Sequence, residues 1–121
     1  MQLSEIVRRS IVVPKNEAAQ RLIETDQFSE KWINEYFVLP VGGEFASIYT
    51  SGLFQEINTI CGSHIGDYAE EAIQVQHQNL LVNLLNKKRG TYSQATAAFC
   101  EQLINLCTQA NERQMPLYFV L

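Results

Sequence analysis

Apolar and polar positions alternate with two different spacings along the chain, and the longest regular stretch lies in the C-terminal half. After Asp67, apolar residues recur every three or four positions, which is the spacing of one face of an α-helix. A second stretch with the same spacing runs to about Asn111, and a short connection around Gly90 separates the two. Because so short a connection requires antiparallel helices, the pattern predicts a helical hairpin over residues 67–111.

Two segments have the composition of β-strands instead. Residues 36–39 and 45–50 are rich in aromatic and β-branched side chains, and they flank Gly42 and Gly43, a pair that suits a tight turn. This pattern predicts a β-hairpin at about 36–50, with Pro40 restricting its first strand to an edge of the sheet. The apolar segment 117–121 is predicted to form a further strand.

These elements together indicate an α+β fold. We expect it to be mainly helical, with a small antiparallel sheet packed on the helical hairpin. Nearer the N-terminus, Asn16 is a suitable N-cap for a short helix that ends at about Glu24. With 121 residues, of which 46% are hydrophobic, the chain has the size and the apolar content of a single domain over residues 1–121.

The composition also bears on where the protein resides. The N-terminal residues lack the apolar core of a signal peptide, and no apolar run approaches the roughly 18 residues that a membrane-spanning helix needs. Three cysteines form an odd set, which suits reduced thiols better than a disulfide framework. We therefore expect a cytoplasmic protein that makes no use of a membrane.

Charge is distributed unevenly. The net charge of −4 disfavours nucleic acid as a partner, because phosphate binding draws on lysine and arginine. Between Trp32 and Asn86 there is no lysine or arginine at all. Such a segment is either an ordinary solvated surface or a surface that attracts a basic partner. On the second interpretation the candidate partner-binding residues are Glu35, Glu44, Tyr49, Glu56, Asp67, Glu70 and Glu71.

One short segment contains residue types that also occur in reactive sites. Cys61 and His64 have the spacing of half a zinc site, and His77 lies beside the apolar face of the following helix. A thiol next to an imidazole can also become a nucleophile. Nothing in the sequence completes either arrangement, so we expect no metal, no cofactor and no catalytic residue, and Cys61 is most simply a buried apolar side chain.

Three functions remain open at this point. The first is a small acidic protein-binding domain, an inhibitor of the bacterial immunity or antitoxin type that neutralises a basic partner such as a nuclease toxin. The second is a small enzyme or ligand-binding domain with a pocket between sheet and helical hairpin, using Cys61, His64 and His77. The third is a structural subunit of a larger assembly. The acidic segment and the missing catalytic motifs favour the first, and the sequence does not define the oligomeric state.

Overall fold

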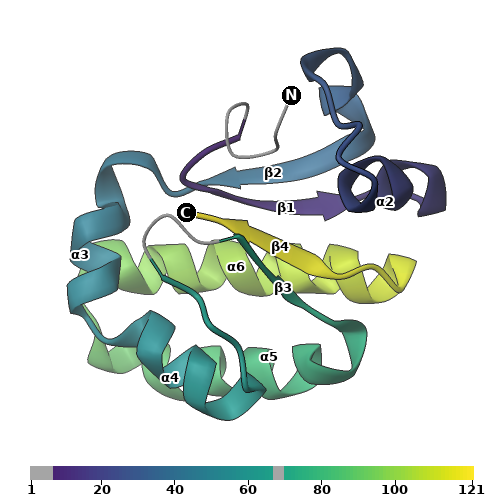
Figure 1. Ribbon diagram of the computed structural model, residues 1–121. Helices are drawn as coiled ribbons and strands as arrows, with labels where there is room; N and C mark the ends of the chain where they lie inside the picture. The colour runs from purple at the N-terminus through teal and green to yellow at the C-terminus, as the bar shows by residue number, and fades with distance from the viewer. Residues whose placement is uncertain (1–6, 67–69) are drawn as a thin grey trace.

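The computed structural model describes residues 7–66 and 70–121, in which an antiparallel sheet lies between two unequal layers of helices (Figure 1). The strands are β1 (Ser10–Pro14), β2 (Tyr36–Pro40), β3 (Glu70–Ile73) and β4 (Leu117–Val120), in the order β2-β1-β4-β3. The α-helices are α2 (Glu17–Glu24), α3 (Phe45–Thr50), α4 (Leu53–Cys61), α5 (Gln78–Lys88) and α6 (Gln94–Arg113). Short 3₁₀ helices are η1 (Glu30–Glu35), η2 (Gly42–Glu44), η3 (Val75–His77) and η4 (Arg89–Thr91).

Strand β1 is buried on both of its faces. Ile11, Val12 and Val13 are all 0% exposed, so the continuous apolar run is explained by packing above and below the sheet. Because successive side chains of a strand point to opposite faces, Ile11 and Val13 join the larger apolar cluster while Val12 joins a smaller one. We call the side of the larger cluster the inner face of the sheet and the other side the outer face.

The inner face carries the larger helical layer. Figure 1 shows α6 running along the sheet, with α3, α4 and α5 completing this layer. On α4, the Phe54 ring meets the rings of Phe99 and Phe119 edge-on, each at a centroid distance of 6.4 Å. The Gln78 side chain, at the start of α5, donates from Nε2 to the Met115 carbonyl oxygen at 2.7 Å. Residues from helices and strands therefore share one core.

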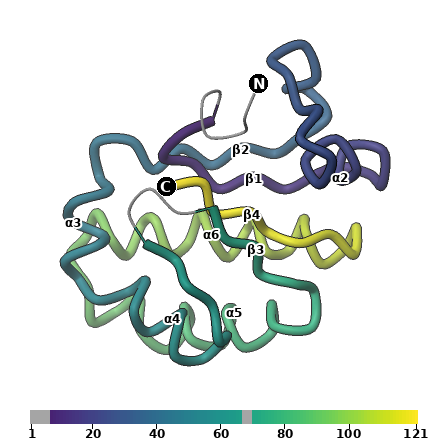
Figure 2. Tube along the Cα trace, viewed as in Figure 1, coloured from purple at the N-terminus to yellow at the C-terminus, as the bar shows by residue number. Residues whose placement is uncertain are grey.

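The outer face is covered by much less of the chain. Helix α2 and the segment after it pack beside β1 and β2, away from α4 and α5 (Figure 2). The ring of Phe28 lies edge-on to Tyr36 at 4.9 Å between centroids, and the Tyr36 hydroxyl donates to the Ala19 carbonyl oxygen at 2.6 Å. These contacts attach α2 to the half of the sheet formed by β1 and β2.

The predicted α+β class is confirmed, and so are the small antiparallel sheet, the C-terminal strand and its packing on a helical hairpin. The cap at Asn16 is also confirmed, because its side chain accepts from the Ala19 amide. The predicted start of the hairpin is wrong. Asp67 lies outside the described residues, but 70–73 form β3 and the first hairpin helix begins at Gln78.

The predicted β-hairpin at 36–50 is wrong in its second half. Tyr36–Pro40 is an edge strand, as Pro40 requires, but it pairs with β1 and is followed by η2 and α3. In segment 45–50, Ile48 is fully buried while Ala46 and Thr50, which a strand would place on the same face, are exposed, which is inconsistent with strand alternation. The Phe45 and Tyr49 rings, four positions apart, lie 5.6 Å from one another along one side of the helix.

Because helices and strands share one core, substituting a buried residue of that core should destabilise the whole protein. Phe119 is 1% exposed, so Phe119→Ala is expected to lower the free energy of unfolding by about 3–5 kcal/mol through lost burial and an unfilled cavity. Urea denaturation followed by circular dichroism measures this. Leu80→Ala is the matched control, because Leu80 is 46% exposed and its loss should change stability by less than about 0.5 kcal/mol. Equal effects of the two substitutions would contradict the described core.

Candidate functional site

The residues predicted to bind a partner do not form one surface. Glu35 ends η1 on the outer side of the sheet, whereas Glu44 and Tyr49 belong to η2 and α3 in the inner layer. Glu56 lies on α4, and Glu70 and Glu71 lie on β3. Asp67 lies outside the described residues. The acidic segment is therefore continuous in sequence but divided among different surfaces of the protein.

Glu56 makes contacts that serve the fold. Its carboxylate accepts a short hydrogen bond from the Tyr92 hydroxyl and lies 3.1 Å from the Lys88 ammonium. The Tyr92 hydrogen bond is the main cause that lowers the pKa of Glu56, and Lys88 adds to it while burial acts in the opposite direction. Glu56 thus joins α4 to the connection between α5 and α6, and its charge is already balanced.

Basic residues from other parts of the chain approach the acidic segment in space. The Arg9 guanidinium lies 3.6 Å from the centroid of the Phe45 ring. Lys15 and Arg113 lie over Phe37 at 5.0 and 4.8 Å. In the folded protein, basic side chains from outside the acidic segment therefore lie beside aromatic rings of that segment.

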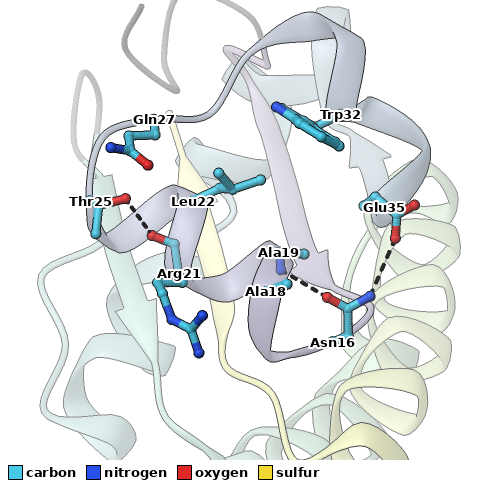
Figure 3. Close-up of a pocket in the computed structure, with 9 residues that line it drawn as sticks. All are labelled: Asn16, Ala18, Ala19, Arg21, Leu22, Thr25, Gln27, Trp32 and Glu35. Atoms are coloured by element: carbon cyan, nitrogen blue, oxygen red, sulfur yellow. Dashed lines mark hydrogen bonds between the residues drawn. The ribbon is translucent and has the colours of Figure 1, made fainter.

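A hollow of about 430 Å³ lies between α2 and η1, and we call it the Trp32 hollow (Figure 3). On the α2 side, Ala18, Leu22 and Thr25 share one helical face because they are spaced by four and three residues. On the η1 side, Trp32 and Glu35 are one 3₁₀ turn apart and therefore lie one above the other. Small or apolar side chains thus form much of the wall, Arg21 and Gln27 also line the hollow, and a carboxylate lies at one end.

Asn16 fixes that carboxylate relative to α2. Its Oδ1 accepts from the Ala19 amide at 2.8 Å, which caps the helix, and its Nδ2 donates to Glu35 Oε2 at 3.3 Å (Figure 3). The Lys15 amide also donates to the Glu35 carbonyl oxygen at 2.9 Å. The helix cap predicted from sequence therefore also positions a side chain of the hollow.

A second hollow, of about 260 Å³, lies on the other side of α2, and we call it the Tyr118 hollow. Helix α2 and its end contribute Ile23, Glu24 and Asp26, and the sheet contributes Glu70, Glu71, Ala72, Tyr118 and Phe119. Four of these residues are carboxylates, and no lysine or arginine is among them. Burial raises the pKa of Tyr118 to about 12, and the negative charge of Glu24 adds to this effect. The phenol therefore stays neutral beside acidic groups.

Helix α2 forms a ridge between the two hollows. Ala18, Leu22 and Thr25 differ from residues 23 and 24 by 100° or more around the helix axis, at 100° per residue. Two of the acidic residues, Glu24 and Asp26, lie at the C-terminal end of α2, where the helix dipole disfavours negative charge by about 0.3–1 kcal/mol each. We call the ridge with its two hollows the α2 face.

The described chain has a further groove of about 400 Å³ between α4 and α5. Ile60 and Leu80 are exposed in it, at 40% and 46%. Lys87 and the paired Lys88 line its edge, so this groove is apolar and basic where the α2 face is acidic.

The contacts of Cys61 and His64 in the described structure run through main-chain atoms and Glu71. The Cys61 thiol lies 3.9 Å from the main-chain carbonyl oxygen of His77, and the main-chain amide of His64 donates to Glu71 Oε2 at 2.9 Å. Burial raises the pKa of the Cys61 thiol, and it raises those of Cys100 and Cys107 to about 11 and about 12. All three thiols are therefore protonated at neutral pH.

Of the predicted partner-binding residues, Glu35 lines the Trp32 hollow and Glu70 and Glu71 line the Tyr118 hollow, whereas Glu24 and Asp26 were not among the predicted residues. These two precede the segment without basic residues, so a search based on charge runs did not include them. A signal was available, because acidic residues at the C-terminal end of a predicted helix oppose its dipole. Functional positions are among the places where such a local preference is broken.

The chain was also compared with known proteins. No protein-family model, no curated protein and no solved structure matches it. Among the described residues, no three or more His, Cys, Asp or Glu side chains are grouped to hold a metal ion. Within residues 7–66 and 70–121, no helix has both the length and the apolar character needed to cross a membrane. The α2 face must therefore be interpreted from its own residues.

Thiol reactivity tests the assignment of the cysteines. All three are buried and protonated, so Ellman's reagent should react with the native protein at pH 7–8 far more slowly than with the protein unfolded in guanidinium chloride. A Cys61→Ser variant should show the same slow native reaction. If one thiol of the native protein reacted at once and the Cys61→Ser variant lost that reaction, Cys61 would be an activated nucleophile.

Proposed function

We propose that the protein is a small acidic protein-binding domain that recognises a basic partner through its α2 face. The observation that carries this proposal is the gathering of Glu24, Asp26, Glu70 and Glu71 around the Tyr118 hollow. These carboxylates come from two distant parts of the chain. Two of them occupy a helix end where their charge opposes helix stability, although Glu24 also accepts a hydrogen bond from Gln20 Nε2 at 3.0 Å.

The surroundings of these carboxylates suit a protein surface as the ligand. Trp32 is 39% exposed, and Tyr118 contributes a second aromatic side chain with a polar tip. Aromatic residues beside polar groups are frequent where proteins bind one another. An acidic surface also speeds the encounter with a basic protein and excludes acidic ones. The α2 face combines both properties.

An inhibitor function is consistent with this surface. Proteins that bind nucleic acid hold phosphates with lysine and arginine, and an acidic protein can occupy the same side chains. We therefore propose an inhibitor of the bacterial immunity or antitoxin type, acting on a basic protein such as a nuclease toxin. The buried free thiols further support a reducing, cytoplasmic setting for this activity.

The other two functions have less support. An enzyme or ligand-binding domain built on Cys61, His64 and His77 would need these side chains around one cavity, and none of the three lines the hollows and groove described above. The contacts of Cys61 and His64 described above are made with main-chain atoms or with Glu71. A structural subunit remains a prediction, and the α4–α5 groove is the surface that a second copy would contact.

Charge substitution on the α2 face tests the proposed function. Glu24→Lys combined with Asp26→Asn changes the net charge by +3. Asparagine is chosen at position 26 because it tolerates the left-handed backbone that Asp26 adopts, at φ 57°. Tagged protein is used to capture partners from a lysate of the source organism. We expect the wild type to retain a basic protein whose affinity falls with rising salt, and the variant to bind that purified protein at least about tenfold more weakly.

The control variant has the same change in net charge, at positions outside the α2 face. Glu101→Lys with Glu112→Gln also adds +3, on exposed positions of α6 on the inner side of the sheet. It should retain wild-type affinity, and an equimolar amount should inhibit the activity of the captured protein as the wild type does. Equal binding by both double variants would contradict the α2 face as the binding site. A captured partner whose activity is unaffected would contradict the inhibitor function.

A further inference from the structure

The Trp32 hollow has a polarity that selects its ligand. Its walls include the small or apolar side chains of α2 and the indole of Trp32, with Arg21, Thr25 and Gln27 also in the lining, whereas its end near Asn16 carries the Glu35 carboxylate. Figure 3 shows Leu22 and Trp32 facing one another across the hollow and Glu35 turned toward Asn16. A ligand that fills it must therefore combine an apolar stem with a positive end.

The indole favours cations. The Lys31 ammonium already lies 5.2 Å from the Trp32 ring centroid, and Lys31 does not line the hollow. Arg21 is part of the lining, but Figure 3 shows its guanidinium directed away from Trp32 and Leu22. The side of the indole that borders the hollow is therefore available to a further cation. A cation–π interaction at an exposed site contributes roughly 0.5–1 kcal/mol.

Among cationic side chains, arginine fits this arrangement best. Its planar guanidinium stacks on aromatic rings and binds a carboxylate through two donors, while the lysine ammonium is a compact and strongly hydrated charge. The methylene stem of arginine would pack between Leu22 and Trp32. Asn16 holds one oxygen of Glu35 at 3.3 Å and so restricts the orientation of the carboxylate that would receive the guanidinium.

From these features we propose that the Trp32 hollow is an anchor site for one arginine side chain of the partner protein. This inference rests on the proposed function and adds to it the residue type that the partner inserts. The Tyr118 hollow then supplies longer-range attraction, and the Trp32 hollow supplies a specific contact near the other side of α2. Binding interfaces commonly depend on such a buried or stacked arginine.

Trp32 provides the measurement, because it is the only tryptophan in the chain. The probe is the peptide acetyl-Gly-Arg-Gly-amide, compared with the same peptide carrying citrulline, which has nearly the same shape without the charge. Binding is followed by Trp32 fluorescence and by the indole N–H resonance. We expect a saturable change with the arginine peptide and about tenfold weaker binding of the citrulline peptide.

Two variants complete the test. Glu35→Gln removes the charge at an exposed position and should lower the affinity for the arginine peptide by about fivefold. Glu101→Gln on α6 should leave the affinity for that peptide unchanged. Equal binding of the arginine and citrulline peptides, or no saturable change at Trp32, would overturn the anchor site. Loss of the basic partner in the Glu24→Lys, Asp26→Asn variant would then still support the proposed function, so the two failures can be told apart.

Discussion

The antiparallel pairing of β1 with β4 determines where every other part of the structure lies. Its register places Ile11 opposite Phe119 and Val12 opposite Tyr118. Because side chains alternate between faces, the first pair enters the core beneath the helices and the second faces outward. A shift by one residue would exchange the two faces. Helix α2 follows β1 directly and packs on the outward face, so the same pairing also positions the α2 face.

The outer face is only partly covered, and this has a functional consequence. Helix α2 packs beside β1 and β2 through Ala19, Phe28 and Tyr36, which leaves a hollow against β3 and β4. Carboxylates surround that hollow although two of them oppose the helix dipole. Asn16 meanwhile caps α2 and holds Glu35. Interactions that fold the N-terminal segment thus also arrange the side chains proposed to bind a partner.

Sequence patterns predicted the elements whose local signals agree with their tertiary surroundings. The cap at Asn16, the strand after Pro116 and the antiparallel helices around Gly90 are of this kind. Segment 45–50 was misassigned because its aromatic and β-branched residues suit a strand, whereas the segment forms a helix that buries Ile48 and leaves Ala46 and Thr50 exposed. The Tyr118 hollow could not be predicted, since Glu24 and Glu70 meet only through the pairing of β3 and β1 with β4.

The central claim is that the α2 face contacts the partner, and amide hydrogen exchange locates that contact directly. Exchange is compared between the free protein and its complex with the captured basic protein. Binding at the α2 face predicts slower exchange in α2, in the segment that leads to η1 and in β3, with no change in α4 and α5. Slower exchange confined to α4 and α5 would place the partner in the opposite groove and contradict the account.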